Sequence, residues 1–189
     1  TGAAPAVVVG DLDARVEGLP LVRADVGQGA ADLAAHLAAQ GHRSLAVITW
    51  PGASERLEGV RRGWGRTGPV HAFEVPTPSH INGETAARAA QQAAPRPDAV
   101  IALCDELALG VLDAAAFLGL QVPHDVSVAG MDDLPGVDAK GLSSVFVPYR
   151  PMGDLAGGIL ATALDGTLAQ EPPPLPTSLA LRHTTAARG

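Results

Sequence analysis

Acidic side chains follow two apolar runs of the sequence that are predicted to be neighbouring β-strands. Asp105 comes after the run 99–103, and Asp132 comes after the run 126–129. A carboxylate accepts hydrogen bonds, either from ligand hydroxyls or from the amides at the start of a helix. Because ligands bind beyond the carboxyl ends of parallel strands, we expect a bound molecule to lie near these two residues.

Other reactive side chains give little support for catalysis or metal binding. Cys104 is the one cysteine, which excludes an internal disulfide and a multi-cysteine metal site. A catalytic thiol needs a base beside it, and the neighbouring residues supply none. The six histidines are scattered without ligand spacing, so we expect no metal and no cofactor. Asp105 is expected to cap the helix that follows it.

These side chains belong to a predicted strand, helix and strand in residues 97–133. Both strands are almost continuously apolar, which is typical of parallel strands covered on both faces. The same alternation continues along the chain, with further strands expected at 5–10, 44–49, 70–75, 142–147 and 178–182 and further helices at 30–41, 55–64, 84–94 and 152–164. We therefore predict an α/β fold with a doubly wound parallel sheet.

Composition restricts the class of protein. With 189 residues, 47% hydrophobic and 17% charged, the chain is globular. Its net charge is −7 and it has no basic run, so it carries no electrostatic signature of binding to nucleic acid or anionic lipid. No signal peptide and no bilayer-spanning apolar run is evident, so we expect a cytoplasmic protein that does not contact a membrane.

Several stretches occur together in a specific order and spacing. They are Asp25 and the segments 36–43, 56–60, 97–100, 105–110, 119–128, 130–133, 142–145 and 179–182. Together they resemble the effector-binding core of lactose-repressor-like (LacI/GalR) transcription regulators. The resemblance implies a type I periplasmic-binding-protein fold, no enzymatic activity, a small sugar-like effector and a homodimer.

The resemblance also implies a domain organisation. Residues 24–147 correspond to the carboxyl-terminal lobe of the effector-binding domain, and the amino-terminal lobe is mostly absent from the chain. Residues 1–23 would end that lobe and 148–168 would form its crossover helix, while 169–189 form a connector, the last strand and a tail expected to fray. Operator DNA would be bound only through a helix-turn-helix domain that this chain lacks.

Five residues are predicted to contact the effector. By the resemblance, Arg56 reaches into the cleft, where its planar group grips two hydroxyls; the alternative is a solvated arginine. Asp132 would accept hydroxyl hydrogen bonds, the alternative being a turn cap. Gln28 and His80 are further candidates at the cleft rim. Cys104 stands where the family usually has asparagine, which shifts the polar contacts elsewhere.

The helix 106–118 is expected to supply part of a dimer contact, with Leu109 exposed for it; core packing of Leu109 is the alternative. Two other functions stay open from the sequence. One is a transport receptor of the same fold, and the other is a doubly wound enzyme that uses Asp105, Asp132 or Cys104.

Overall fold

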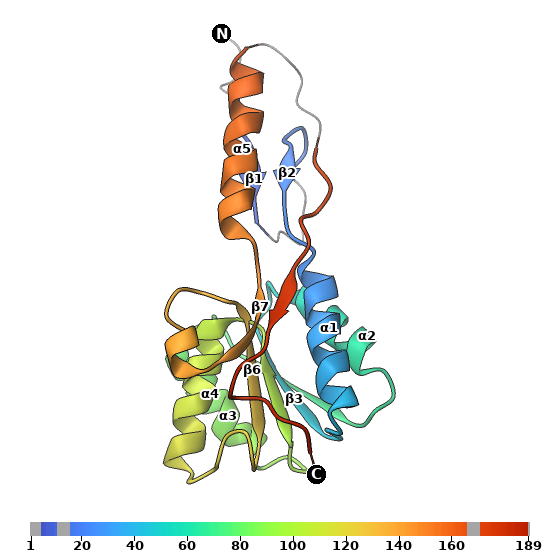
Figure 1. Ribbon diagram of the computed structural model, residues 1–189, viewed down its shortest axis with the longest axis vertical. Helices are drawn as coiled ribbons and strands as arrows, with labels where there is room; N and C mark the ends of the chain where they lie inside the picture. Colours follow the sequence, from blue (N-terminus) through green and yellow to red (C-terminus); the bar gives the residue numbers. More distant parts are fainter. Residues whose placement is uncertain (1–4, 11–15, 166–170, 189) are drawn as a thin grey trace.

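The computed structural model describes residues 5–10, 16–165 and 171–188, which form two parts of unequal size (Figure 1). The larger part, called here the lower lobe, is a sheet between two pairs of helices. The smaller part, called the upper segment, is a long helix beside two short strands. The predicted α/β fold with a mostly parallel sheet is confirmed.

The sheet of the lower lobe has six strands in the order β4-β3-β5-β6-β7-β8. The first five are parallel, and β8 runs antiparallel to β7. The strands are β3 (Leu45–Thr49), β4 (Val70–Glu74), β5 (Ala99–Ala102), β6 (Ser127–Asp132), β7 (Ser143–Phe146) and β8 (Ser178–Ala180). Every residue of β3, β5 and β6 is buried, as expected for strands covered on both faces.

Two helices cover each face of this sheet. Helices α1 (Val26–Ala39) and α2 (Ser54–Trp64) share one hydrophobic cluster with the strands. Helices α3 (His80–Ala90) and α4 (Asp105–Phe117) share the cluster of the opposite face. A 3-10 turn, η1 (Asp138–Lys140), lies between β6 and β7. The carboxyl ends of the parallel strands, which lie between the two helix layers, are therefore where a ligand is expected.

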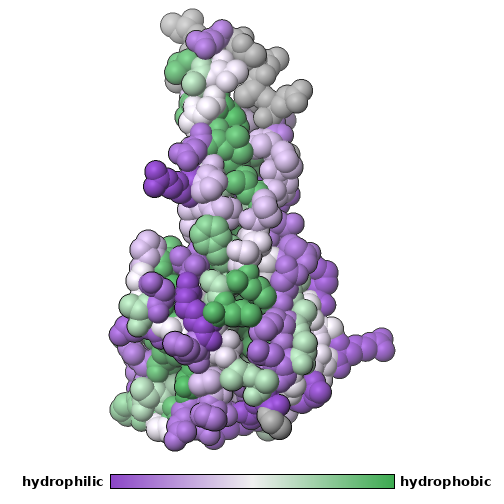
Figure 2. All heavy atoms as spheres, viewed as in Figure 1, coloured by the Kyte–Doolittle hydropathy of each residue, from purple (hydrophilic) through white to green (hydrophobic). Residues whose placement is uncertain are grey.

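The upper segment consists of β1 (Val8–Val9), β2 (Leu21–Val22) and α5 (Tyr149–Leu164). The two strands pair in parallel, and α5 lies beside them (Figure 1). Hydrophobic residues gather along the middle of this segment on the face shown in Figure 2. The chain passes between the parts after β2, after β7 and before β8. The domain limits at 23 and 147 stay predictions, and the one at 168 lies outside the described residues.

Several predicted element boundaries were wrong. Helix α3 begins at His80 instead of 84, because the Ser79 hydroxyl accepts the Asn82 amide and caps it. Helix α5 begins at Tyr149, and Pro151 lies in its first turn, where a helix needs no amide donor. Helix α1 begins at Val26, after Asp25 as its cap.

The prediction that the tail frays was also wrong for the described residues up to 188. The Arg188 amide donates to the Gln40 carbonyl at 2.8 Å, and the Val128 amide donates to the Thr184 carbonyl at 2.8 Å. Nε2 of the buried His42 ring lies 3.1 Å from the Ala186 carbonyl oxygen, so His42 also contacts the tail. Within the described part of the chain, no helix has the length and hydropathy to cross a membrane.

Candidate functional site

An ion pair lies at the carboxyl edge of the sheet. Arg56, in the first turn of α2, donates from Nη1 to Asp132 Oδ1 at 2.8 Å, and Asp132 ends strand β6. The same nitrogen donates to the Leu103 carbonyl at 2.7 Å. Arg56 is 6% exposed and Asp132 is 8% exposed. The two residues with the strongest predicted ligand roles are therefore brought together.

The backbone at Asp132 is held in an unusual conformation. Asp132 has a φ of 112° and Asp133 a φ of 53°, values that residues with side chains rarely adopt. The Asp133 amide donates to Ser144 Oγ at 3.1 Å, and this hydroxyl donates to Asp105 Oδ1 at 2.6 Å. The Leu134 amide donates to Asp105 Oδ2 at 2.8 Å. Backbone strain of this kind persists where surrounding contacts over-determine it, as they do here.

Asp105 therefore has a different role from the one predicted. Cys104 is the N-cap residue of α4 and makes no side-chain cap, while the Asp105 carboxyl binds the turn after β6. Burial, opposed by the bonds from Ser144 and Leu134, raises the pKa of Asp105 to about 6. A Cβ atom on Gly130 would lie 2.3 Å from Asp105 Oδ1, so only glycine leaves room for this carboxyl.

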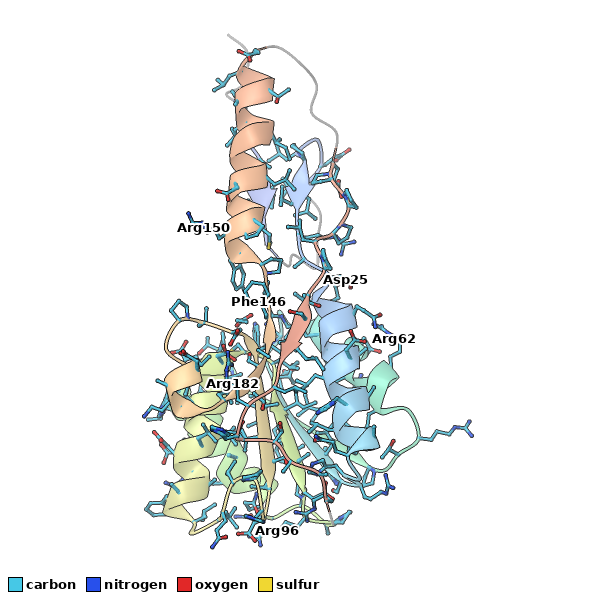
Figure 3. All side chains as sticks on the ribbon, viewed as in Figure 1. Asp25, Arg62, Arg96, Phe146, Arg150 and Arg182 are labelled. Carbon is cyan, nitrogen blue, oxygen red and sulfur yellow. The ribbon has the colours of Figure 1, made fainter. Side chains whose placement is uncertain are left out.

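A second arginine, which follows the last strand β8, stabilises the same turn. Arg182 Nη1 donates to Asp133 Oδ1 and to the Leu142 carbonyl, both at 2.7 Å. Figure 3 shows Arg182 within the lower lobe, whereas Asp25 and Phe146 lie where the two parts meet. Asp133 is thus bound by Arg182, whereas Asp132 is bound by Arg56.

Cys104 lies two residues after the end of β5 and close to the ion pair. It is 7% exposed, and burial, with the Asp132 charge adding to it, raises the pKa of its thiol to about 11. The thiol is therefore protonated at neutral pH and is a poor nucleophile. Its contact with a ligand stays a prediction.

The structure does not bring Gln28 or His80 to the ion pair. Gln28 lies exposed in the first turn of α1, and its amide donates to Asp32 Oδ1 at 2.7 Å. His80 Nε2 lies 2.9 Å from Asp113 Oδ2, which connects α3 to α4. Both side chains thus have protein partners, and their ligand contacts stay predictions.

Two aromatic residues complete the surroundings of the pair. The Arg56 guanidinium carbon lies 5.9 Å from the centre of the Trp50 ring, in the loop after β3. The Tyr149 hydroxyl donates to Asp132 Oδ1 at 2.7 Å. Tyr149 is not among the contact residues predicted from the sequence. Its position just after the carboxyl end of β7 was the available signal.

Comparison with known proteins identifies the family. A model of periplasmic binding protein-like domains matches residues 34–185. The chain belongs to this family. Relatives of this domain include an HTH-type transcriptional regulator of Mycobacterium tuberculosis, 29% identical over 82% of this chain and 50% of its own length. The ribose operon repressor of Escherichia coli K12 is 35% identical over 66% of this chain and 41% of the repressor.

Solved structures agree with this assignment. A LacI family transcriptional regulator from Enterococcus faecium with bound ribose superposes with a TM-score of 0.89, covering 98% of this chain and 71% of that chain at 23% identity, which shows the shared fold. The resemblance predicted from the sequence is confirmed, and the relatives are transcriptional regulators, not enzymes. The chain spans about half the length of the curated relatives it matches.

Proposed function

We propose that this chain is the effector-binding and dimerisation region of a LacI/GalR-type transcriptional regulator that works in the cytoplasm. The effector is a small, sugar-like molecule that binds where the lower lobe faces the upper segment. The observation that carries this proposal is the buried pair of Arg56 and Asp132 at the carboxyl edge of a parallel sheet.

The chemistry of the pair suits a ligand with neighbouring hydroxyl groups. The guanidinium of Arg56 supplies hydrogen-bond donors for ligand hydroxyl oxygens, and the Asp132 carboxylate can accept from hydroxyl groups. Trp50, which lies beside Arg56, offers an apolar ring for the carbon face of a sugar. The relatives that support ribose as the first ligand to test are the ribose operon repressor and the ribose-bound regulator.

The mechanism is selection between two arrangements of the two parts. A ligand that contacts both parts favours the arrangement in which those contacts form, by as much as its affinity differs between the two. In a dimer this difference is passed to DNA-binding domains outside these residues. Operator DNA is thus a partner of the whole regulator and not of this acidic region.

The dimer surface that we propose includes the outer face of α3 and α4. Phe117 is 72% exposed at the end of α4, and Ile81 is exposed on α3. Leu109 is less exposed than either, since it is half-buried and packs against the cluster beneath α4. Exposed apolar side chains on neighbouring helices favour contact with a second copy.

Binding of ribose tests the site directly. In the full-length regulator, Arg56→Lys keeps the positive charge beside Asp132 but removes the guanidinium donors, so we expect ribose affinity to weaken at least about tenfold. Arg61→Lys is the matched control, because Arg61 lies exposed on the same helix. Calorimetric titration measures both.

A panel of other sugars, sugar phosphates and nucleosides extends this test by thermal unfolding. A ligand at one hundred times its dissociation constant stabilises the folded protein by about 2.7 kcal/mol. If no compound raises the unfolding midpoint, or if Arg56→Lys and Arg61→Lys bind a true ligand equally well, the site assignment is wrong.

A further inference from the structure

Tyr149 connects the two parts of the molecule at the ion pair. It is the first residue of α5, the helix of the upper segment, yet its hydroxyl donates to Asp132 Oδ1 in the lower lobe at 2.7 Å. Tyr149 is 43% exposed, whereas Asp132 is buried. The hydrogen bond therefore joins an accessible side chain of the upper segment to a buried carboxylate of the lower lobe.

Two protein donors occupy the same carboxylate oxygen. Arg56 Nη1 lies 2.8 Å from Asp132 Oδ1, and the Tyr149 hydroxyl lies 2.7 Å from it. An ionised carboxylate oxygen has two lone-pair positions, so both positions of Oδ1 are in use. A ligand hydroxyl that binds this oxygen must replace one of the two donors.

Tyr149 is the donor that can be replaced. Arg56 is buried, carries a charge that Asp132 neutralises and donates also to the Leu103 carbonyl, so its withdrawal would leave a buried carboxylate without its cation. The Tyr149 hydroxyl is neutral, and its exposed ring can turn toward water, which satisfies the hydroxyl again.

From this geometry we infer that the Tyr149 hydroxyl competes with the ligand for Asp132 Oδ1 and ties α5 to the lower lobe until a ligand hydroxyl displaces it. Tyr149 is then a positioning residue that sets both affinity and the freedom of the upper segment. The inference rests on the proposed function, because it concerns the same site and the same class of polyhydroxyl ligand.

Removal of the competing hydroxyl should strengthen binding. We expect Tyr149→Phe in the full-length regulator to bind ribose about threefold to tenfold more tightly than the native protein, since the ligand no longer breaks a protein hydrogen bond. Phe146→Leu is the control, because Phe146 is a similarly exposed aromatic residue at the same junction and should leave the affinity unchanged.

The hydroxyl can also be followed without any ligand, because Tyr149 is the one tyrosine among these 189 residues. Burial and the Asp132 carboxylate raise the pKa of Tyr149 above its usual range. In the 189-residue chain labelled with a fluorinated tyrosine, its single resonance should titrate at higher pH than in the Asp132→Asn variant. Saturating ribose should lower the titration midpoint, since the displaced hydroxyl no longer lies against the carboxylate.

The outcomes separate the two proposals. If Asp132→Asn does not lower the titration midpoint of Tyr149, the hydrogen bond between Tyr149 and Asp132 is refuted, whether or not ribose binds. Ribose binding that neither lowers the midpoint nor strengthens in Tyr149→Phe overturns the competition. If ribose binds neither the native protein nor Tyr149→Phe, the result counts against ribose as the effector and against competition by this ligand. The titration still tests the hydrogen bond between Tyr149 and Asp132.

Discussion

At the scale of single residues, the site depends on charges that are buried in pairs. A buried ion pair gains little net stability, because the loss of water around both charges offsets their attraction. We therefore propose a binding role, not a stabilising one, for the pair of Arg56 and Asp132, which has Trp50 and Tyr149 beside it. Asp105 is different, because its carboxyl serves the backbone that presents Asp132.

The buried carboxyl of Asp105 predicts a pH dependence of stability. In the folded chain its pKa is about 6, whereas in an unfolded chain an aspartate ionises near pH about 4. Between these two pH values the folded chain binds more protons than the unfolded chain, so its free energy of unfolding should fall as the pH rises. The loss amounts to about 3 kcal/mol for a shift of about two units, and it is complete above pH about 6.

Asp105→Asn tests this prediction by urea unfolding across the same pH range. The variant cannot ionise, so its free energy of unfolding relative to the native chain should increase from low to neutral pH. Glu106→Gln is the control, since Glu106 is exposed in the same turn of α4. A difference between Asp105→Asn and the native chain that is constant with pH would contradict the buried ionised carboxyl.

At the scale of elements, the helices that hold the site approach one another backbone to backbone. A Cβ atom on Gly59 of α2 would lie 2.2 Å from the Gly27 carbonyl of α1, and one on Gly63 would lie 2.0 Å from the Ala31 carbonyl. Larger side chains would separate the helices. Because Arg56 lies one turn before Gly59, this close approach also sets how far Arg56 reaches over the sheet.

Gly59→Ala should therefore destabilise the lower lobe by about 1–3 kcal/mol, since the added methyl group overpacks the contact with α1. Gly157→Ala is the matched comparison, because Gly157 lies exposed inside α5 with no atom near its Cβ position. There alanine should stabilise the helix by about 0.5–1 kcal/mol. Urea unfolding measures both, and equal effects of the two substitutions would refute the close packing of α1 and α2.

At the scale of the whole molecule, the two parts differ in how much of their apolar surface is covered. The lower lobe has a hydrophobic cluster on each face of its sheet, and one of these clusters continues into the upper segment at Met152, Ala156 and Ile159 of α5. The upper segment has two short strands and one helix, and Leu164 of α5 is 71% exposed. In the proposed function, the molecule acts as a sensor through ligand binding between these parts and through self-association by α3 and α4.

Self-association gives the whole-molecule prediction. We expect the chain to form dimers at micromolar concentration, and Phe117→Glu, which places a charge on the proposed α3 and α4 surface, to shift it toward monomer in sedimentation velocity. Leu109→Glu should act in the same direction. Leu164→Glu is the control, since it alters an exposed leucine of the upper segment. A monomeric native chain, or equal dissociation by Leu164→Glu, would show that this surface is not the interface.

The sequence by itself determined the alternation of strands and helices, the parallel sheet and the strand ends at which Cys104 and Asp132 lie. These features depend on local hydrophobic pattern, which neighbouring residues decide. The family resemblance added Arg56 to the site. Helix starts were less predictable, as at Tyr149, because single side chains such as caps and first-turn prolines set them.

Only the tertiary structure decided which distant side chains meet. Arg56 and Asp132 are 76 positions apart and Tyr149 lies on another element, so their contact depends on strand order and on the close packing of α1 against α2. The predicted role of Asp105 was wrong for the same reason, since its partners Ser144 and Leu134 come from strand β7 and the turn before it. Such contacts join segments far apart in the chain, and no local pattern encodes them.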